Sequence, residues 1–444
     1  MIIYVETLGC SRNQVDSEVM LGKLLAAGHT RTDDPARAQV IVVNTCGFIT
    51  TAADEAVDTI LEMAKFKEQG ACRRLIVTGC LAQRYKDDPD LTHSLPEVDA
   101  FVGTGACDQI AAVVADRAPS PLILFPDPNA RGFADPFETR ALSGDPFAFV
   151  KVSEGCNRHC TYCIIPTLRG RQRSRPVGDI CAEAVSLVKK GVKEIILTAE
   201  NTTDYGRDLT PGTGFVDVLA TLSRQVAAVN PTAWIRMLYT HPESLTRQMV
   251  ETVRDHHNIC AYYDVPIQHA DTTLLRRMGR PYSRKDLKTL FAMIRETDPA
   301  AALRTTVITG FPGETDAMFD TLLNFIRKIR FDHLGVFTYS DADDLPSHGL
   351  KNHVPEDVAR LRHDTLMAAQ AEISEQINQA HVGKTYDVLV EENPEPGLFT
   401  GRTIFQAPEV DGVTFIYSEG LAIGDLVQVR ITVGYEYDIA GEKA

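Results

Sequence analysis

The stretch EGCNRHCTYCII, residues 154–165, places three cysteines within eight positions at the spacing C-x3-C-x2-C. These are Cys156, Cys160 and Cys163. Thiolates bind soft or borderline metals, and iron–sulfur clusters are held by cysteine. Zinc is the alternative, although a structural zinc site normally has four Cys or His ligands. If three thiolates hold a four-iron cluster instead, one iron has no protein ligand and can coordinate a small molecule.

The segments around this stretch alternate between strands and amphipathic helices. An apolar run at 147–155 precedes the cysteines, and further strand–helix units follow up to a long helix at 355–380. Such alternation favours a parallel sheet with helices packed on it. The alternation predicts a parallel βα barrel of about six units, open or closed, that spans residues 142–377, and we expect the open form from the resemblance described below.

Two further units flank the predicted barrel. Residues 1–125 alternate strands and helices as well, which predicts an N-terminal α/β domain with a parallel sheet. Residues 378–444 contain short alternating strands and glycine-bearing turns, which predicts a small all-β barrel. The segment 127–146 is rich in Pro, Gly and Asp, and we interpret it as the connection between the first two domains. The predicted fold class is α/β with a C-terminal β-barrel.

Three other cysteines share one setting in the N-terminal domain. Cys10, Cys46 and Cys80 each end an apolar strand just before a helix. The carboxyl ends of parallel strands lie along one edge of the sheet, where such folds bind ligands. The three thiols can therefore meet in one crevice; the alternative is three separately buried cysteines, since free Cys is often buried. We interpret the remaining four as structural or incidental: Cys72, Cys107, Cys181 and Cys260.

The compact motif, with Tyr162 before its last cysteine, resembles the signature of the radical S-adenosylmethionine (SAM) enzymes. The stretches TLGCSRNQVDSE (7–18), VNTCGF (43–48) and TGCLAQRY (78–85) resemble N-terminal motifs of the methylthiotransferases within that superfamily. The C-terminal segment is similar to a TRAM domain, so the resemblance covers nearly the whole chain. It implies SAM and two 4Fe–4S clusters as cofactors. Cys156, Cys160 and Cys163 would then hold the cluster that binds SAM, and Cys10, Cys46 and Cys80 the auxiliary cluster.

The resemblance also suggests where SAM lies, over the carboxyl ends of the barrel strands. The stretch TAEN (198–201) stands where the superfamily often has a Gly-Gly-Glu motif, and we assign its glutamate to the amino group of SAM. The alternative for all these residues is ordinary packing at strand ends, and the sequence identifies no further catalytic residue. The candidate SAM-binding residues are Tyr162, Glu200, Asn201, Gln268 and Gly310.

Within the methylthiotransferases, the chain resembles the RimO-like group most. This likeness lies in GCSRNQVDSE (9–18), YYDVPIQHA (262–270), RRMGR (276–280) and APEVDG (407–412). It implies that the substrate is an aspartate of small-subunit ribosomal protein twelve, which receives a methylthio group on its β-carbon. The nearest alternative is a MiaB-like enzyme that modifies a tRNA adenosine, and a more remote one is a non-catalytic zinc-binding protein.

Charge bears on the choice of substrate. The whole chain has a formal net charge of −15, and residues 378–444 contain four Lys or Arg against eleven Asp or Glu. An acidic barrel suits a strongly basic protein, whereas a tRNA-binding barrel should be basic; a solvated acidic surface with no partner is the alternative. Four arginines could contact phosphate or line the entrance for SAM or substrate, and they do not decide the question: Arg169, Arg171, Arg173 and Arg175.

The N-terminus shows no signal peptide, and no apolar run approaches the roughly 18 residues of a membrane span. We therefore expect a cytoplasmic protein without membrane contact. Separately, we expect the chain to be a monomer. The resemblance further implies an electron donor such as flavodoxin or ferredoxin.

Overall fold

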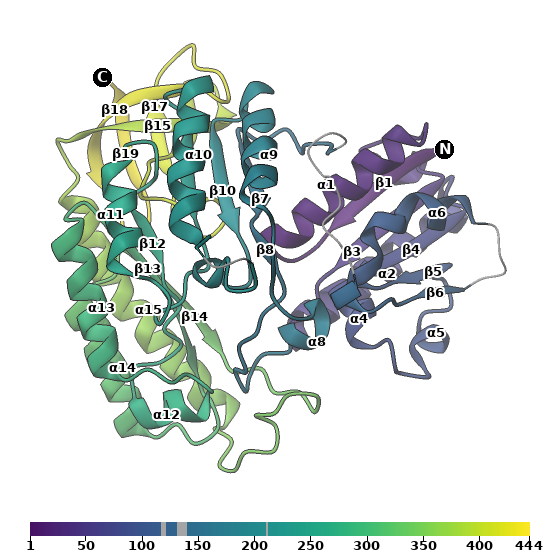
Figure 1. Ribbon diagram of the computed structural model, residues 1–444, viewed down its shortest axis with the longest axis horizontal. Coiled ribbons are helices and arrows are strands. Elements are labelled where there is room, and N and C mark those ends of the chain that lie inside the picture. The colour runs from purple at the N-terminus through teal and green to yellow at the C-terminus, as the bar shows by residue number, and fades with distance from the viewer. Residues whose placement is uncertain (117–120, 131–139, 210–211) are drawn as a thin grey trace.

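The computed structural model describes residues 1–116, 121–130, 140–209 and 212–444. It contains three units in chain order: an α/β unit, a βα barrel and a small β-barrel (Figure 1). The connection predicted at 127–146 lies partly outside these residues. Among the helices in the described ranges, none combines the length and the apolar character needed to cross a membrane.

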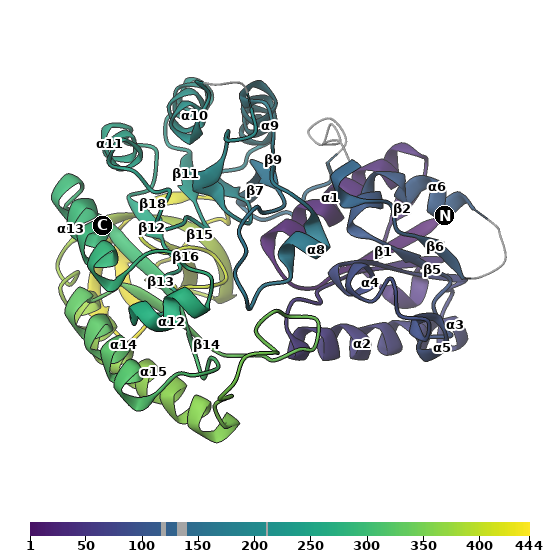
Figure 2. The same ribbon diagram turned by 60° about the horizontal axis from the view of Figure 1, so that its bottom comes forward.

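The N-terminal unit is built on a six-stranded parallel sheet with the order β2-β1-β3-β4-β5-β6. All six residues of β3 are buried, as expected for a central strand covered on both faces. Helix α2 packs on one face of the sheet, and α1 and α6 pack on the other (Figure 2). The elements are β1 (Ile2–Thr7), α1 (Ser11–Ala26), β2 (Thr30–Arg31), β3 (Val40–Thr45), α2 (Thr50–Ala64), α3 (Phe66–Gln69), β4 (Arg74–Gly79), α4 (Cys80–Arg84), α5 (Leu91–Ser94), β5 (Ala100–Val102), α6 (Ile110–Ala115) and β6 (Leu122–Leu124).

The central unit arranges six parallel strands as two three-stranded sheets, β11-β10-β7 and β12-β13-β14. A parallel bridge between Ile235 and Ile259 joins the two sheets at β11 and the approach to β12. The elements are β7 (Phe147–Lys151), β8 (Ser153–Glu154), α8 (Ile165–Arg169), β9 (Arg173–Ser174), α9 (Val177–Lys189), β10 (Glu194–Thr198), α10 (Phe215–Val229), β11 (Trp234–Met237), α11 (Arg247–Asp255), β12 (Tyr262–Asp264), α12 (Thr272–Arg277), α13 (Arg284–Thr297), β13 (Ala302–Thr309), α14 (Asp316–Ile329), β14 (His333–Thr338) and α15 (Glu356–Gln379).

Local sequence signals explain where the outer helices begin. Thr246 and Thr315 accept the backbone N–H three residues on and so cap α11 and α14. Ser283 and Asp286 form a capping box at the start of α13. The apolar faces of these helices join the strands in the largest apolar cluster of the molecule, which holds the barrel together.

The barrel is open between its first and last strands. Within the described residues no ladder pairs β7 with β14. Helix α1 of the N-terminal unit lies against β7, and its Val15 and Val19 enter an apolar cluster with Phe149 and Ile196 on the barrel strands. The N-terminal unit is therefore attached to the open side of the barrel (Figure 1).

The C-terminal unit is a closed five-stranded barrel with the order β15-β16-β17-β19-β18. It docks through buried ion pairs at Glu194, the first residue of β10: Arg402 Nη2 and Arg236 Nε each lie 2.6 Å from its carboxylate. The C-terminal unit therefore covers the amino ends of the barrel strands. Its strands are β15 (Thr385–Glu395), β16 (Leu398–Arg402), β17 (Thr414–Tyr417), β18 (Leu426–Gly434) and β19 (Ile439–Lys443).

The predicted fold class is confirmed, and two alternating stretches form shorter strands than their lengths allow. Of residues 262–269, only the three residues of β12 form a strand; Gln268 has a φ of 64° and contacts β13 through one isolated bridge. Within residues 397–407, β16 ends at Arg402, and the side chain of Gln406 accepts the backbone N–H of Thr403 in the turn that follows. The short edge strands β2 and β6 were not predicted.

Candidate active site

Cys10, Cys46 and Cys80, called the first trio from here on, follow three adjacent strands of the N-terminal sheet; Cys156, Cys160 and Cys163 are called the second trio. Cys10 is the N-cap of α1 after β1, Cys46 follows β3, and Cys80 begins α4 after β4. Two glycines with positive φ permit the tight turns before Cys10 and Cys80. At Gly9 a Cβ would stand 2.8 Å from Cβ of Cys46, so only glycine lets these two loops approach so closely.

The second trio lies on the loop after β8. The backbone N–H of Cys156 donates to the carbonyl of Gly170, and that of Cys163 donates to the carbonyl of Cys160. The loop is also held from the far side of the barrel, where Thr161 donates from its N–H to the carbonyl of Met278 and from its hydroxyl to that of Arg277. The loop that carries the compact motif is thus held at Cys156 and at Thr161.

All six predicted cysteine ligands line one cavity of about 570 Å³ between the N-terminal unit and the barrel. A cavity of this size is typical of small-molecule sites. The thiols within each trio are close enough to affect one another's pKa. Negative charge on Cys10 or Cys46 raises the pKa of Cys80, and negative charge on Cys156 or Cys160 raises the pKa of Cys163. The structure therefore brings both trios to one space.

Burial and nearby arginines set the acidity of these thiols. Burial raises the pKa of Cys80 and Cys156 to about 11. Burial also raises the pKa of Cys163, to about 12. At Cys10 the same burial is outweighed by the guanidinium groups of Arg12 and Arg169, so its pKa is lowered. Positive charge thus gathers at the first trio.

Three buried polar groups of the cavity have atoms without a hydrogen-bond partner among the described residues. They are both carboxylate oxygens of Glu200, Nε2 of His241 and Nη1 of Arg280. Because His241 Nδ1 accepts the backbone N–H of Glu243, Nε2 carries the hydrogen of the neutral ring. A carboxylate and two donors are therefore available to a ligand, and such buried groups are costly without one.

The five predicted SAM-binding residues have different surroundings. Tyr162, Glu200, Asn201 and Gln268 line the cavity. The hydroxyl of Tyr162 accepts bonds from Arg280, and the amide of Asn201 donates to Asp204. Gly310 does not lie among the lining residues; a Cβ there would stand 2.4 Å from Ala359 of α15, so this glycine serves close packing.

Sequence reasoning missed several residues of the cavity. Arg12, Arg158, His241 and Arg280 line it. The three arginines lie inside the stretches quoted above, where no role was assigned to them, and His241 lies outside those stretches. The position of His241, four residues after β11, is the signal that could have found it, since strand carboxyl ends face this space. Of the four clustered arginines, Arg169 lines the cavity, fully buried among carboxylates, so contact with phosphate does not describe it.

The donor set fits iron–sulfur clusters. In the ranges that the structure describes, no three His, Cys, Asp or Glu side chains lie close enough together to hold a single metal ion. A four-iron cluster takes each thiolate on a different iron, so its ligands stand further apart than those of one ion. All ten cysteines are free thiols, which leaves both trios available.

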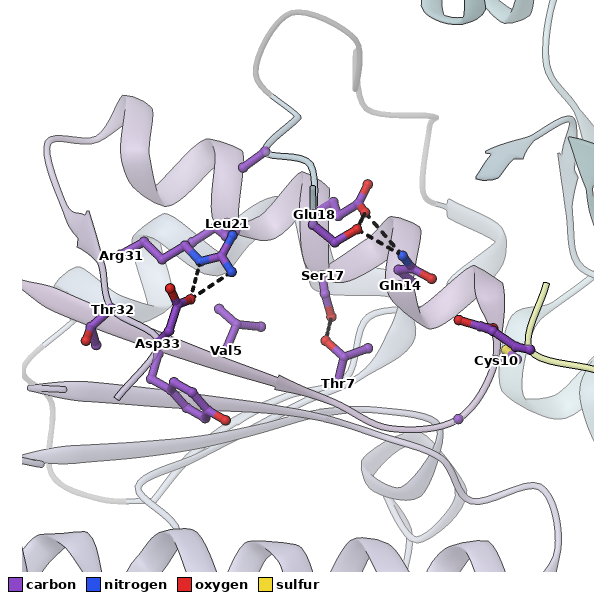
Figure 3. A pocket seen from close by; sticks show the side chains of 15 residues that line it. Val5, Thr7, Cys10, Gln14, Ser17, Glu18, Leu21, Arg31, Thr32 and Asp33 are labelled. Atoms are coloured by element: carbon purple, nitrogen blue, oxygen red, sulfur yellow. Dashed lines mark hydrogen bonds and ion pairs between the residues drawn. The ribbon is translucent and has the colours of Figure 1, made fainter. Parts of the chain in front are cut away.

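Cys10 also borders a second cavity, of about 320 Å³. Figure 3 shows Cys10 at one end of it, Thr7 and Ser17 hydrogen-bonded beneath α1, and the Arg31–Asp33 ion pair toward the other end. Cys10 thus lines both cavities.

Comparisons with known proteins follow the three structural units. Residues 2–103 match the family described as "Uncharacterized protein family UPF0004", residues 150–326 match the radical SAM superfamily, and residues 382–443 match the TRAM domain. A protein of Desulfosudis oleivorans named "Ribosomal protein uS12 methylthiotransferase RimO" is 48% identical over 444 residues, which covers 100% of both chains. This chain belongs to the RimO family.

Further RimO proteins agree with this placement. Those of Clostridioides difficile and Geobacter sulfurreducens are 42% and 44% identical over 441 residues. These matches cover 99% and 98% of this chain, and 98% and 97% of the relatives. RimO membership makes the chain a radical SAM methylthiotransferase, which confirms the predicted family and enzyme class.

Among solved structures, the radical SAM methyltransferase TsrM of Kitasatospora setae is similar, with a TM-score of 0.57 and 12% sequence identity. The match covers 92% of this chain and 80% of that one. At this identity the likeness concerns the fold alone.

Proposed function

We propose that this chain replaces a hydrogen on the β-carbon of an aspartate in ribosomal protein uS12 with a methylthio group. The observation that carries the proposal is the single cavity lined by six cysteines from two units. A radical made beside one trio and a sulfur held at the other would then act on one substrate side chain. The relatives named for uS12 support the choice of substrate.

The two trios have different roles in this proposal. Cys156, Cys160 and Cys163 hold the cluster that binds SAM, and Cys10, Cys46 and Cys80 hold the auxiliary cluster. When bound, the cluster of the second trio would supply the electron that cleaves SAM to a 5′-deoxyadenosyl radical. The auxiliary cluster would supply the sulfur that is transferred.

The buried groups without partners suit the amino-acid end of SAM. The carboxylate of Glu200 would accept hydrogen bonds from the ammonium group of SAM. Nε2 of His241 and Nη1 of Arg280 would donate hydrogen bonds to the carboxylate group of SAM. Tyr162 orients Arg280, because its hydroxyl lies 2.6 Å from Nη2. Each interaction gives a hydrogen-bond partner to a buried polar atom that otherwise has none among the described residues, so binding gains from all three.

Apolar side chains from both units complete the lining. Phe48 and Ile49 follow Cys46, Ile165 follows the compact motif, and Phe337 at the end of β14 is 53% exposed. An apolar wall excludes water from the space where a reactive carbon radical forms.

The remaining partners follow from the substrate. The exposed carboxylates of the C-terminal barrel complement a basic ribosomal protein: Asp387, Glu392, Glu395, Glu419, Glu436 and Glu442. A ribosomal substrate places the chain in the cytoplasm, and a donor such as flavodoxin or ferredoxin supplies single electrons. Because one chain provides all six cysteines of the cavity, a monomer suffices.

Mass spectrometry tests the proposal directly. The reconstituted protein is incubated anaerobically with SAM, a reductant, and either uS12 or tRNA. We expect one methylthio group on an aspartate of uS12 and none on tRNA. Methylthiolation of tRNA adenosine with unmodified uS12 would contradict the proposal.

A further inference from the structure

We propose that Arg169 is a positioning residue for the auxiliary cluster. Its guanidinium donates a hydrogen bond to the sulfur of Cys80 and ties that cysteine to the loop that carries the second trio. This inference rests on the proposed function, in which Cys80 is a cluster ligand.

The contacts of Arg169 reach both sides of the cavity. This last residue of α8 lies six positions after Cys163, yet its Nη2 is 3.7 Å from Sγ of Cys80 and 2.5 Å from Oδ1 of Asn13 in the N-terminal unit. Its Nη1 is 2.7 Å from Oε1 of Glu154, two residues before Cys156. The guanidinium of Arg169 therefore connects Cys80 of the first trio to Glu154, at the start of the loop that carries the second trio.

Burial and pairing hold the guanidinium in place. Arg169 is 2% exposed, and Nη1 also lies 2.8 Å from Oδ2 of Asp16 on α1. Lys151 bonds the same two carboxylates, at 2.7 Å from Asp16 and 2.7 Å from Glu154. Two cations thus share two carboxylates in a site without water screening, where a flexible side chain would lose these bonds.

The charge has a predictable effect on a cluster bound to Cys80. Reduction adds a negative charge to the cluster, and a nearby cation stabilises the reduced form more than the oxidised form. Hydrogen bonds to cluster sulfurs act in the same direction and are among the factors that set the potential. Arg169 therefore raises the reduction potential of the auxiliary cluster, besides fixing Cys80 relative to the compact motif.

The test isolates the auxiliary cluster in the full-length chain. Cys156, Cys160 and Cys163 are all replaced with Ala, the remaining cluster is reconstituted, and its midpoint potential is measured by titration followed with EPR. We expect Arg169→Met in this background to shift the midpoint to a more negative potential, and Arg169→Lys to shift it less because the charge is kept.

Arg175→Met is the matched control, because Arg175 is equally buried and ion-paired, at 2.6 Å from Glu183, but does not line the cavity. If the Arg169→Met variant binds the auxiliary cluster and has the same midpoint potential as the background protein without this substitution, the inference is overturned. A parent background that binds no cluster would instead refute the proposed function, so the two failures are distinguishable.

A second measurement uses the unmodified holoenzyme, so it holds even where Arg169→Met fails to fold. Protein with 15N-labelled arginine is examined by pulsed EPR for coupling between guanidinium nitrogen and the reduced auxiliary cluster. We expect a coupling that is lost in Arg169→Lys. Identical spectra for the native protein and this variant would contradict the inference.

Discussion

Arg12 lies two residues after Cys10, and its Nε is 3.4 Å from Oε1 of Glu200 on the barrel. Its Nη1 also donates to the carbonyl of Ala199, and its guanidinium lies over the ring of Tyr239. Glu200 is buried, and burial followed by the nearby Glu154 raises its pKa while Arg12 opposes the shift. Arg12, beside the first trio, thus counteracts the effect of burial on the pKa of a carboxyl group beside the second trio.

Glu200→Gln should weaken SAM binding. The substitution keeps the size of the side chain but removes the charge that pairs with the ammonium of SAM. Hydrogen bonds to charged groups contribute about 1.5–3 kcal/mol, so the Kd for SAM should rise roughly 10- to 150-fold. Calorimetry on the reconstituted, unreduced protein measures this. Glu375→Gln, on the exposed face of α15, is the control, and an unchanged Kd in Glu200→Gln would remove Glu200 from SAM binding.

Cys46→Ala should separate the two clusters. We expect iron to fall from about eight to about four per chain, because only the compact motif still holds a four-iron cluster. SAM cleavage should continue, whereas methylthio transfer to uS12 should stop. Cys72→Ala is the matched control, since Cys72 is buried but does not line the cavity. Loss of SAM cleavage in Cys46→Ala would contradict the division of roles between the trios.

Both cysteine trios could be predicted from sequence because each depends on a short-range feature. The compact motif is contiguous, and Cys10, Cys46 and Cys80 each end a recognisable buried strand. Parallel topology then brings the carboxyl ends of the strands to one edge of the sheet. Because β1, β3 and β4 are neighbours in the sheet, the three cysteines that follow them lie near one another.

The contacts between units could not be predicted in this way. Arg12 reaches Glu200 only because α1 packs along the open side of the barrel, and no local pattern encodes that placement. Within the barrel unit, the close approach of Gly310 to Ala359, 49 positions away on α15, also depends on tertiary packing. The docking of the C-terminal barrel at Glu194 likewise depends on the tertiary position of Arg402.

Arg402→Met should destabilise the attachment of the C-terminal barrel. Arg402 pairs with Glu194 and Glu391 and is 2% exposed. Removing one partner of a buried charge network typically costs about 3–5 kcal/mol, because charge is left uncompensated. A lower thermal midpoint and faster hydrogen exchange in residues 385–443 should report it. Arg430→Met on the exposed face of β18 should change neither, and equal effects of both substitutions would argue against this role.

His381 should make stability depend on pH in the acid range. Its ring stacks on Phe405 at 4.5 Å and its Nδ1 bonds the hydroxyl of Tyr386 at 2.7 Å. Burial, with smaller contributions from Lys384 and His333, lowers its pKa from 6.5 to about 4.

The sign follows from proton uptake. Between pH 6.5 and about 4 the unfolded chain binds a proton at His381 that the folded chain excludes. This residue's effect on the free energy of unfolding is therefore constant above pH 6.5, becomes unfavourable as pH falls through this window, and levels off below pH 4. His381→Phe keeps an aromatic ring against Phe405, so its denaturant midpoint should fall less steeply between pH 6.5 and 4. Parallel pH profiles for the variant and the native protein would show that His381 is not the group responsible.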